Sequence, residues 1–182
     1  KNITLPGEHN RKNATLVIEA LKNIGVDAEE LEIYQAINSF PGSGRRFEKL
    51  AENLYSDYGH HPVEIQATLQ MAKELSNDVV LVYQPHQNVR QHEIIGQYTD
   101  SIFHDANEIY WLPTYLTREN PDLPILTPQQ LAKNIDKEKV HFAELDDGLW
   151  QEITAAMNSG KLVLCMGAGT IDGWIREQLA KN

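Results

Sequence analysis

The amino-acid sequence predicts an α/β fold in which a mainly parallel sheet is covered by helices on both faces. Short apolar runs alternate along the chain with longer segments whose apolar residues recur at helical spacing. The runs DVVLVYQP and LVLCMG are apolar almost throughout, which is typical of strands that are buried on both faces. Parallel neighbours need long crossover connections, and the helical segments between the runs supply them.

Two helices are expected before the sheet begins. Apolar residues recur at helical spacing over residues 10–24, and Gly25 follows as a natural carboxy-terminal cap. Asp27 and Glu30 have the spacing of a capping box, so a second short helix is expected after them. Residues 39–44, SFPGSG, combine proline with two glycines and cannot sustain a regular element. We therefore place a domain boundary there, between residues 1–43 and 44–182.

Strands and helices then alternate to the end of the chain. Pro62 suits the first turn of a helix, and Thr127, Pro128 and Gln130 have the pattern of a capped helix start. The expected order is a helix from Pro62, a strand at 78–85, a helix from about 90 to 104, a strand at 108–113, a helix at 126–135, a strand at 140–145, a helix at 146–160, a strand at 162–167 and a helix at 170–182. This order predicts a Rossmann-like domain.

Composition excludes several classes of function. A chain of 182 residues with 41% hydrophobic residues can form one buried core with a small appendage. The net charge of −10 argues against a nucleic-acid partner, which needs a concentrated basic face. The sequence contains no run of about 18 apolar residues and no secretory signal, so we expect a cytoplasmic protein without a membrane partner. The single cysteine, Cys165, is expected to be a buried strand residue in a reducing compartment.

Four polar clusters fall in turns or at the ends of elements, where a parallel sheet presents its functional groups. They are GEHNRKN at 7–13, GSGRRFE at 42–48, SDYGHHPVE at 56–64 and YQPHQNVRQ at 83–91. The chain opens on Lys1 and not on Met, with a stretch that is typical of a strand end and a loop. We therefore expect a fragment or a processed chain.

The first two clusters contain side chains that can contact a nucleotide, and each also has an ordinary structural interpretation. His9, Asn10 and Asn13 lie on the opening turn of a helix, and amide side chains offer the donor and acceptor that an adenine edge requires. The alternative for Asn10 is helix capping. Arg46 follows the linker and can reach a phosphate, whereas the alternative is a surface arginine paired with Glu48.

The third cluster is the densest. Asp57, His60 and His61 crowd the amino terminus of the helix that begins at Pro62, a position that favours anions. A zinc site that also uses His86 is the competing interpretation. Neighbouring residues on an extended segment point in opposite directions, and no cysteine or H-x-x-x-H pattern supports zinc. We therefore assign no metal ligand.

The fourth cluster ends a buried strand, where a doubly wound sheet places its ligand crevice. His86 and Arg90 are candidates to hold a carboxylate there, and the alternative is that Arg90 only serves its own helix. The segment GAGTIDG at 167–173 also follows a strand. Its spacing is not G-x-G-x-x-G, so we interpret Gly167 and Gly169 as turn glycines and disfavour a dinucleotide oxidoreductase.

Taken in order, the clusters resemble the Mur ligase family. PGEHNRKNA resembles its P-G-x-H-N-x-x-N-A segment at the end of the central ATPase domain, and GSGRRFE resembles the arginine-bearing segment that opens the third domain. SDYGHHPVE and QPHQNVR are similar to D-D-Y-A/G-H-H-P-x-E and Q-P-H-R-F/Y-T-R of the branch that adds L-alanine to UDP-N-acetylmuramic acid. The resemblance implies that residues 1–43 end the central domain and that 44–182 form the carboxy-terminal, amino-acid-binding domain.

The resemblance also implies roles. ATP, with Mg²⁺, would phosphorylate the carboxylate of UDP-N-acetylmuramic acid, and L-alanine would attack the acyl phosphate. The ATP-binding residues would be His9, Asn10, Asn13, Arg46 and Asp57; the last two would also be catalytic; and His60, His61, His86 and Arg90 would bind the amino acid.

Departures from the family pattern leave alternatives open. Ser56, Gln87 and Val89 replace an aspartate, an arginine and a threonine, so a ligase that recycles a whole tripeptide is the nearest alternative. No G-x-x-x-x-G-K-S/T loop occurs in the sequence, so upstream domains of the same chain are expected partners and the fragment alone is expected to be inactive. A free-standing module that binds a nucleotide or small ligand is the competing class.

Overall fold

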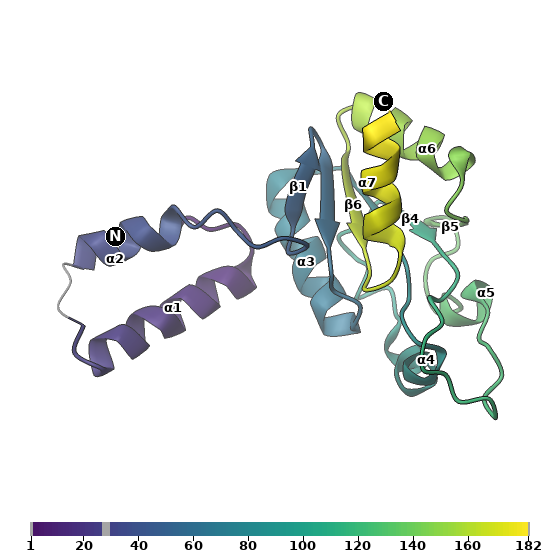
Figure 1. The fold of residues 1–182 in the computed structure, drawn as a ribbon, viewed down its shortest axis with the longest axis horizontal. Coiled ribbons are helices and arrows are strands. Elements are labelled where there is room, and N and C mark those ends of the chain that lie inside the picture. The colour runs from purple at the N-terminus through teal and green to yellow at the C-terminus, as the bar shows by residue number, and fades with distance from the viewer. Residues whose placement is uncertain (1, 27–29, 182) are drawn as a thin grey trace.

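The computed structural model describes residues 2–26 and 30–181 and contains a six-stranded sheet with helices on both faces (Figure 1). The strand order is β1-β2-β6-β3-β4-β5, and every pair is parallel except β1 with β2. The strands are β1 (Glu48–Ala51), β2 (Leu54–Asp57), β3 (Val79–Tyr83), β4 (Glu108–Trp111), β5 (Val140–Phe142) and β6 (Leu162–Met166). The predicted α/β fold class is confirmed.

The core lies on both faces of β3 and β6, whose residues are all buried. One apolar cluster packs α3 (Pro62–Leu75) and the segments of α4 (Asn88–Ile94) and α5 (Pro128–Leu131) against the sheet. A second cluster packs α6 (Asp147–Asn158) and α7 (Ile171–Lys181) against the opposite face. Cys165 lies in β6, and burial raises the pKa of its thiol well above the usual range, so it is a core residue as predicted.

Two helices precede the sheet and extend away from it (Figure 1). They are α1 (Glu8–Asn23), which contacts α3, and α2 (Glu30–Asn38). Both were predicted, and Gly25 follows α1 with φ of 69°. The proposed capping residue Asp27 lies outside the described residues. Among the helices that the structure describes, none has the length and apolar character needed to cross a bilayer.

Two predicted helices are shorter than expected. The helix expected at 90–104 is α4 followed by a single 3-10 turn, η1 (Ile95–Gln97). It ends there because Tyr98 turns into the core and bonds to Gln91, which takes the chain off the helical path. The helix expected at 126–135 forms only α5, although its predicted capping box is present. Asp136 ends that region by donating its backbone N–H to Asp100.

The β1–β2 hairpin was not predicted. Each strand has only four residues, and polar side chains interrupt their apolar pattern. The turn between them contains Asn53 with φ of 61°, a left-handed conformation that asparagine tolerates. The hairpin places Asp57, one of the predicted site residues, at the end of a strand inside the sheet.

Candidate functional site

A cleft of about 1000 Å³ lies between the two leading helices and the sheet domain. Its lining comes from α1, α2 and the linker on one side and from β2 and α3 on the other. Apolar side chains such as Phe40, Phe47 and Met71 supply much of the surface. All five residues predicted to bind the nucleotide line this cleft: His9, Asn10, Asn13, Arg46 and Asp57.

Asp57 is buried at the end of β2 and is fixed by backbone groups on both sides. One carboxylate oxygen accepts the N–H of Phe47 at 2.8 Å and the other accepts the N–H of Gly59 at 2.7 Å. Burial raises the pKa of Asp57, while the two backbone hydrogen bonds and the charge of Arg46 favour its ionised form. The bond to Phe47 also fixes the peptide group that joins Phe47 to Arg46.

Arg46 is exposed at the mouth of the cleft. Its guanidinium lies over the ring of Tyr58, at 5.6 Å from the centroid. The alternative in which Arg46 pairs with Glu48 is wrong, because Glu48 accepts from Arg176 at 2.6 Å and from the backbone N–H of Arg45 at 2.8 Å. The ring of Tyr58 therefore orients the Arg46 guanidinium toward the cleft, where it can bind an anion.

His9 and Asn10 face the cleft from the first turn of α1. The Nδ1 atom of His9 is buried and has no hydrogen-bond partner among the described residues. Desolvation lowers the pKa of His9, which favours the neutral imidazole. The alternative in which Asn10 caps the helix is wrong, because the N-cap is Gly7 and Asn10 instead donates to the backbone oxygen of Pro6 at 2.9 Å.

A line of ring contacts leads from the cleft to the predicted amino-acid site. Beyond Arg46, the Tyr58 ring meets the His60 ring edge-on, with centroids 5.8 Å apart. His60 meets His86 at 5.3 Å, and His86 stacks on Tyr115 at 5.7 Å. The two predicted groups of residues are therefore neighbours, although they come from separate segments of the chain.

His86 lies in the loop after β3, and its Nδ1 atom is also buried without a described partner. Desolvation, followed by the nearby charges of His60 and Arg90, lowers the pKa of His86. Arg90 is exposed on α4. Glu119 caps the same helix by accepting its first two N–H groups at 2.9 and 3.1 Å.

His61 begins α3. Its Nδ1 atom accepts the N–H of Val63 at 3.4 Å, and Glu64 accepts the backbone N–H groups of His60 and His61 at 2.9 and 3.0 Å. This capping box explains why the helix begins there. Capping already uses the Nδ1 atom of His61. Substrate contact by His61 stays a prediction.

Gly167 and Gly169 lie in the turn between β6 and α7, and this turn approaches the site closely. Gly167 has φ of 155° and donates its N–H to the carbonyl of Asp57 at 3.0 Å. A Cβ atom on Gly167 would lie 2.7 Å from the carbonyl oxygen of Gln84, and one on Gly169 would lie 2.6 Å from Cβ of Tyr115. Glycine is needed for the three segments to meet.

Sequence reasoning did not assign Tyr115 or Arg45 to the site. The Arg45 guanidinium lies over the Tyr58 ring at 4.7 Å, donates to the carbonyl of Gly167 at 3.2 Å and reaches Asp172 at 3.6 Å. Its signal was present in the Arg-Arg pair. Tyr115 had no signal, since it falls in an irregular segment without periodicity.

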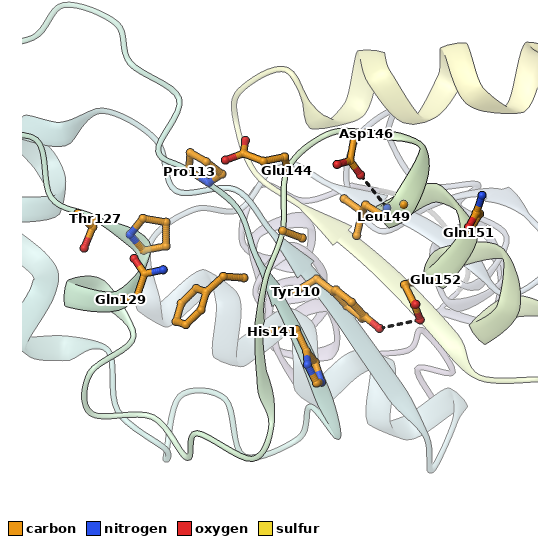
Figure 2. Close-up of a pocket in the computed structure, with 14 residues that line it drawn as sticks. Tyr110, Pro113, Thr127, Gln129, His141, Glu144, Asp146, Leu149, Gln151 and Glu152 are labelled. Carbon is orange, nitrogen blue, oxygen red and sulfur yellow. Dashed lines mark hydrogen bonds between the residues drawn. The ribbon is translucent and has the colours of Figure 1, made fainter.

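A second cavity of about 690 Å³ lies beside β4, β5 and the start of α6 (Figure 2). Figure 2 shows Tyr110 and Glu152 directed toward each other, and the Tyr110 hydroxyl donates to the Glu152 carboxylate at 3.3 Å. None of the predicted site residues lines this cavity. We therefore place the candidate site at the first cleft and its extension toward His86.

Comparison with known proteins identifies the family. Residues 45–169 match the family described as Mur ligase, glutamate ligase domain. The chain is 31% identical over 179 residues to UDP-N-acetylmuramate–L-alanine ligase of Jannaschia sp. (strain CCS1), covering 94% of this chain and 37% of that protein. It is 35% identical over 188 residues to the enzyme of the same name from Rickettsia canadensis (strain McKiel), covering 96% and 38%.

Solved structures agree with this result. The crystal structure of UDP-N-acetylmuramate–alanine ligase from Thermotoga maritima superposes with a TM-score of 0.67 and 25% identity, covering 97% of this chain and 38% of that one. A murein peptide ligase from Psychrobacter arcticus shares the fold, with a TM-score of 0.55 and 22% identity, covering 98% and 38%. The chain thus spans a little over a third of the length of these relatives. The family match and the relatives confirm the resemblance, and the chain belongs to the Mur ligase family.

Proposed function

We propose that this chain is the carboxy-terminal portion of an ATP-dependent ligase that joins L-alanine to UDP-N-acetylmuramic acid in peptidoglycan synthesis. One observation carries the proposal: residues from α1, the linker and β2 line a single cleft, and a line of ring contacts leads from it to His60 and His86. The names of the relatives support the same activity for the longer protein.

The cleft suits an adenine nucleotide. Its apolar walls offer Phe47 and Met71 to the faces of a base, while the amide of Asn13 and the amide oxygen of Asn10 can meet the edge. Neutral His9 has an unpartnered ring nitrogen for a further hydrogen bond. The volume of about 1000 Å³ is large enough for a nucleotide and water.

Arg46 is the proposed phosphate ligand of this half of the site, since a guanidinium binds phosphate oxygens in a bidentate way. Asp57 acts on Arg46 through the backbone, because its carboxylate holds the N–H of Phe47 and hence the preceding peptide. Both oxygens of Asp57 already accept N–H groups, so we assign it to positioning and do not assign it to Mg²⁺. Mg²⁺ would neutralise charge on the ATP phosphates.

The histidine pair suits the incoming amino acid. Burial lowers the pKa of His86, so its neutral ring is favoured and can accept a proton or hydrogen bond from the amino group that attacks the acyl phosphate. Arg90, on the first turns of α4, is the proposed partner of the amino-acid carboxylate. His60 and His61 complete this half of the site.

The remaining parts of the enzyme are proposed to precede this chain. The 182 residues contain no phosphate-binding loop of the G-x-x-x-x-G-K-S/T type. Large apolar side chains of the leading segment are exposed: 69% for Leu16, 74% for Ile24 and 57% for Phe40. Such exposure is expected if this segment packs on the rest of a central ATPase domain. We therefore assign residues 1–43 to that domain and 44–182 to the amino-acid-binding domain. The fragment alone would be inactive, and a reaction that consumes ATP belongs in the cytoplasm.

A tripeptide-recycling ligase is the second candidate. Gln87 stands where the alanine-adding branch carries an arginine, and the loss of one guanidinium removes a charge-assisted contact to a small carboxylate substrate. A larger peptide gains contacts elsewhere and depends less on that group.

The test uses the full-length protein with ATP, Mg²⁺ and UDP-N-acetylmuramic acid. Phosphate release is measured with L-alanine, L-serine, glycine and the tripeptide, and L-alanine is expected to give the highest kcat/KM. Faster release with the tripeptide would select the second candidate. A wild-type protein that binds ATP but releases no phosphate with any acceptor would reject the ligase proposal in favour of a nucleotide-binding module.

Variants of the same protein test the two halves separately. Arg46→Ala is expected to lower kcat/KM for ATP by roughly 100-fold or more, because it removes a charged hydrogen-bond donor to the phosphate oxygens. Arg90→Ala is expected to raise KM for the amino acid with little change in KM for ATP. Lys12→Ala, on the same helix as Asn10 but outside the cleft lining, is the control and should behave as wild type. Unchanged kinetics in Arg46→Ala and Arg90→Ala would refute the assignment of the site.

A further inference from the structure

A buried chain of polar contacts joins the backbone of His60 to that of His86. The Tyr83 hydroxyl donates to the carbonyl of His60 at 2.9 Å and lies 2.9 Å from the Tyr98 hydroxyl. Tyr98 donates to the side-chain oxygen of Gln91 at 2.7 Å, and the Gln91 amide nitrogen donates to the carbonyl of His86 at 2.9 Å. The three side chains that form this chain are fully buried.

The bonded residues come from separate parts of the chain. Tyr83 ends β3, Gln91 lies in α4 and Tyr98 follows η1, while His60 precedes α3. His60 lies outside the strands and helices, and His86 forms one isolated β-bridge with Tyr115, so the ladder of the sheet does not set the separation of the two histidines. The buried chain supplies that constraint, because both of its ends are main-chain carbonyls of the two histidines.

The apolar environment makes these hydroxyl groups costly to bury unless each of them has a hydrogen-bond partner. Tyr83 and Tyr98 pack against Phe103 and Trp111 in the larger apolar cluster, where phenylalanine would fill the same space without a polar group to satisfy. The two hydroxyls carry two protons for three oxygen contacts. With one proton directed to His60 and the other to Gln91, the two tyrosine oxygens meet without a proton between them. Burial raises the pKa of both tyrosines, so both remain protonated donors.

We propose that Tyr83, Tyr98 and Gln91 are positioning residues that hold the His60 and His86 rings at one separation, and thereby preform the amino-acid half of the site. Their carbonyl contacts fix the two backbones, and the ring centroids then lie 5.3 Å apart. The part of this inference that concerns the amino acid rests on the proposed ligase function. The part that concerns the geometry of the histidines does not.

The kinetic test uses Tyr83→Phe and Tyr98→Phe in the full-length protein. Each change removes one oxygen and keeps the ring. We expect KM for the amino acid to rise tenfold or more, while KM for ATP stays within twofold. The control is Phe103→Leu, since Phe103 packs on both tyrosines at 6.4 and 6.1 Å and has no hydrogen-bonding group. An unchanged KM in both tyrosine variants, or an equal rise in Phe103→Leu, would overturn the inference.

A second measurement does not depend on catalysis. Histidine signals of the 182-residue chain are followed by NMR, and the nuclear Overhauser contact between the His60 and His86 rings is compared among the variants. The tyrosine variants should weaken this contact, and Phe103→Leu should keep it. The pKa of His86 should also rise in the tyrosine variants, because the nearby His60 ring lowers it in the wild type. Arg90, Arg118 and Glu119 are the other charged groups that face His86.

The two measurements separate the two proposals. If the wild-type protein ligates nothing, the proposed function fails, and the ring contact still decides whether the tyrosines position the histidines. If the ring contact persists in both tyrosine variants, the positioning inference fails even in an active ligase.

Discussion

The two halves of the candidate site are held together by different kinds of interaction. The nucleotide cleft has one wall on α1, which is attached to α3 through Glu74: this carboxylate accepts from Arg11 at 2.7 Å and from the Gly7 N–H at 2.9 Å, at the protein surface. The histidine half is attached through the fully buried tyrosines 83 and 98 in the core of the sheet domain.

This difference indicates that the position of α1 beside the cleft is adjustable, whereas the relative position of His60 and His86 is fixed. Exposed ion pairs contribute little and are screened by salt, whereas buried hydrogen bonds in a packed core are costly to break. The linker at 39–44 supplies a place for movement, because Gly42 has φ of 87° and open space around it. The proposed nucleotide cleft can therefore adjust its width on binding, while the relative position of the two histidines is already set.

The largest expected effect comes from a matched pair of leucines. Leu81 is fully buried in β3, whereas Leu16 in α1 is 69% exposed. Leu81→Ala should lower the free energy of unfolding by about 3–5 kcal/mol because it leaves a cavity in the core. Leu16→Ala in the 182-residue chain, where this side chain is exposed, should change it by less than about 0.5 kcal/mol. Urea denaturation measures the free energy of unfolding of both variants. Similar losses in the two variants would contradict the distinction between a rigid sheet domain and a loosely attached helix α1.

An intermediate effect is expected at Gly167. Its φ of 155° and the Gln84 carbonyl oxygen, 2.7 Å from a Cβ atom placed there, make Gly167→Ala strained. We expect a loss of about 1–3 kcal/mol in the free energy of unfolding. Gly173→Ala is the control, since Gly173 lies in α7 with open space around it and should gain up to about 1 kcal/mol. If Gly167→Ala is as stable as wild type, the turn between β6 and α7 is not rigid.

Local sequence patterns predicted the parts of the fold that local forces determine. The apolar runs of β3 and β6 and the capping box of α5 were visible because each depends on adjacent residues. The early end of α4 was not visible, because it follows from the burial of Tyr98 against a distant strand. The β1–β2 hairpin was missed because four-residue strands give too little periodicity to detect.

The candidate site shows the same division. The polar clusters that contain His9, Arg46 and His86 could be found from residue type and position alone. Their convergence could not be derived from spacing, since it depends on how α1 and β2 face each other across the cleft. The chain through Tyr83 and Tyr98 had no sequence signal at all, because tyrosine in an apolar run is indistinguishable from an ordinary core residue.

The smallest expected effect concerns Glu74 and tests whether α1 is held only at the surface. The Arg11 guanidinium, the Gly7 N–H and Gln70 lower the pKa of Glu74 from 4.5 to about 2. A carboxyl group whose pKa is lowered by folding stabilises the folded arrangement fully above its unfolded pKa, and loses that contribution as the pH falls toward the folded value. The attachment of α1 should therefore weaken as the pH falls from 4.5 to about 2.

Hydrogen exchange at the Gly7 amide measures this attachment directly, because its N–H is bonded to Glu74. Its protection should fall on acidification, after correction for the intrinsic exchange rate, while amides of β3 keep theirs over the same range. In Glu74→Gln the side chain no longer titrates, so protection at Gly7 should start lower and stay constant with pH. A Gly7 amide that stays protected at low pH in the wild type would mean that apolar contacts around Ala14 and Ile18 hold the wall, and that the cleft is as rigid as the histidine half.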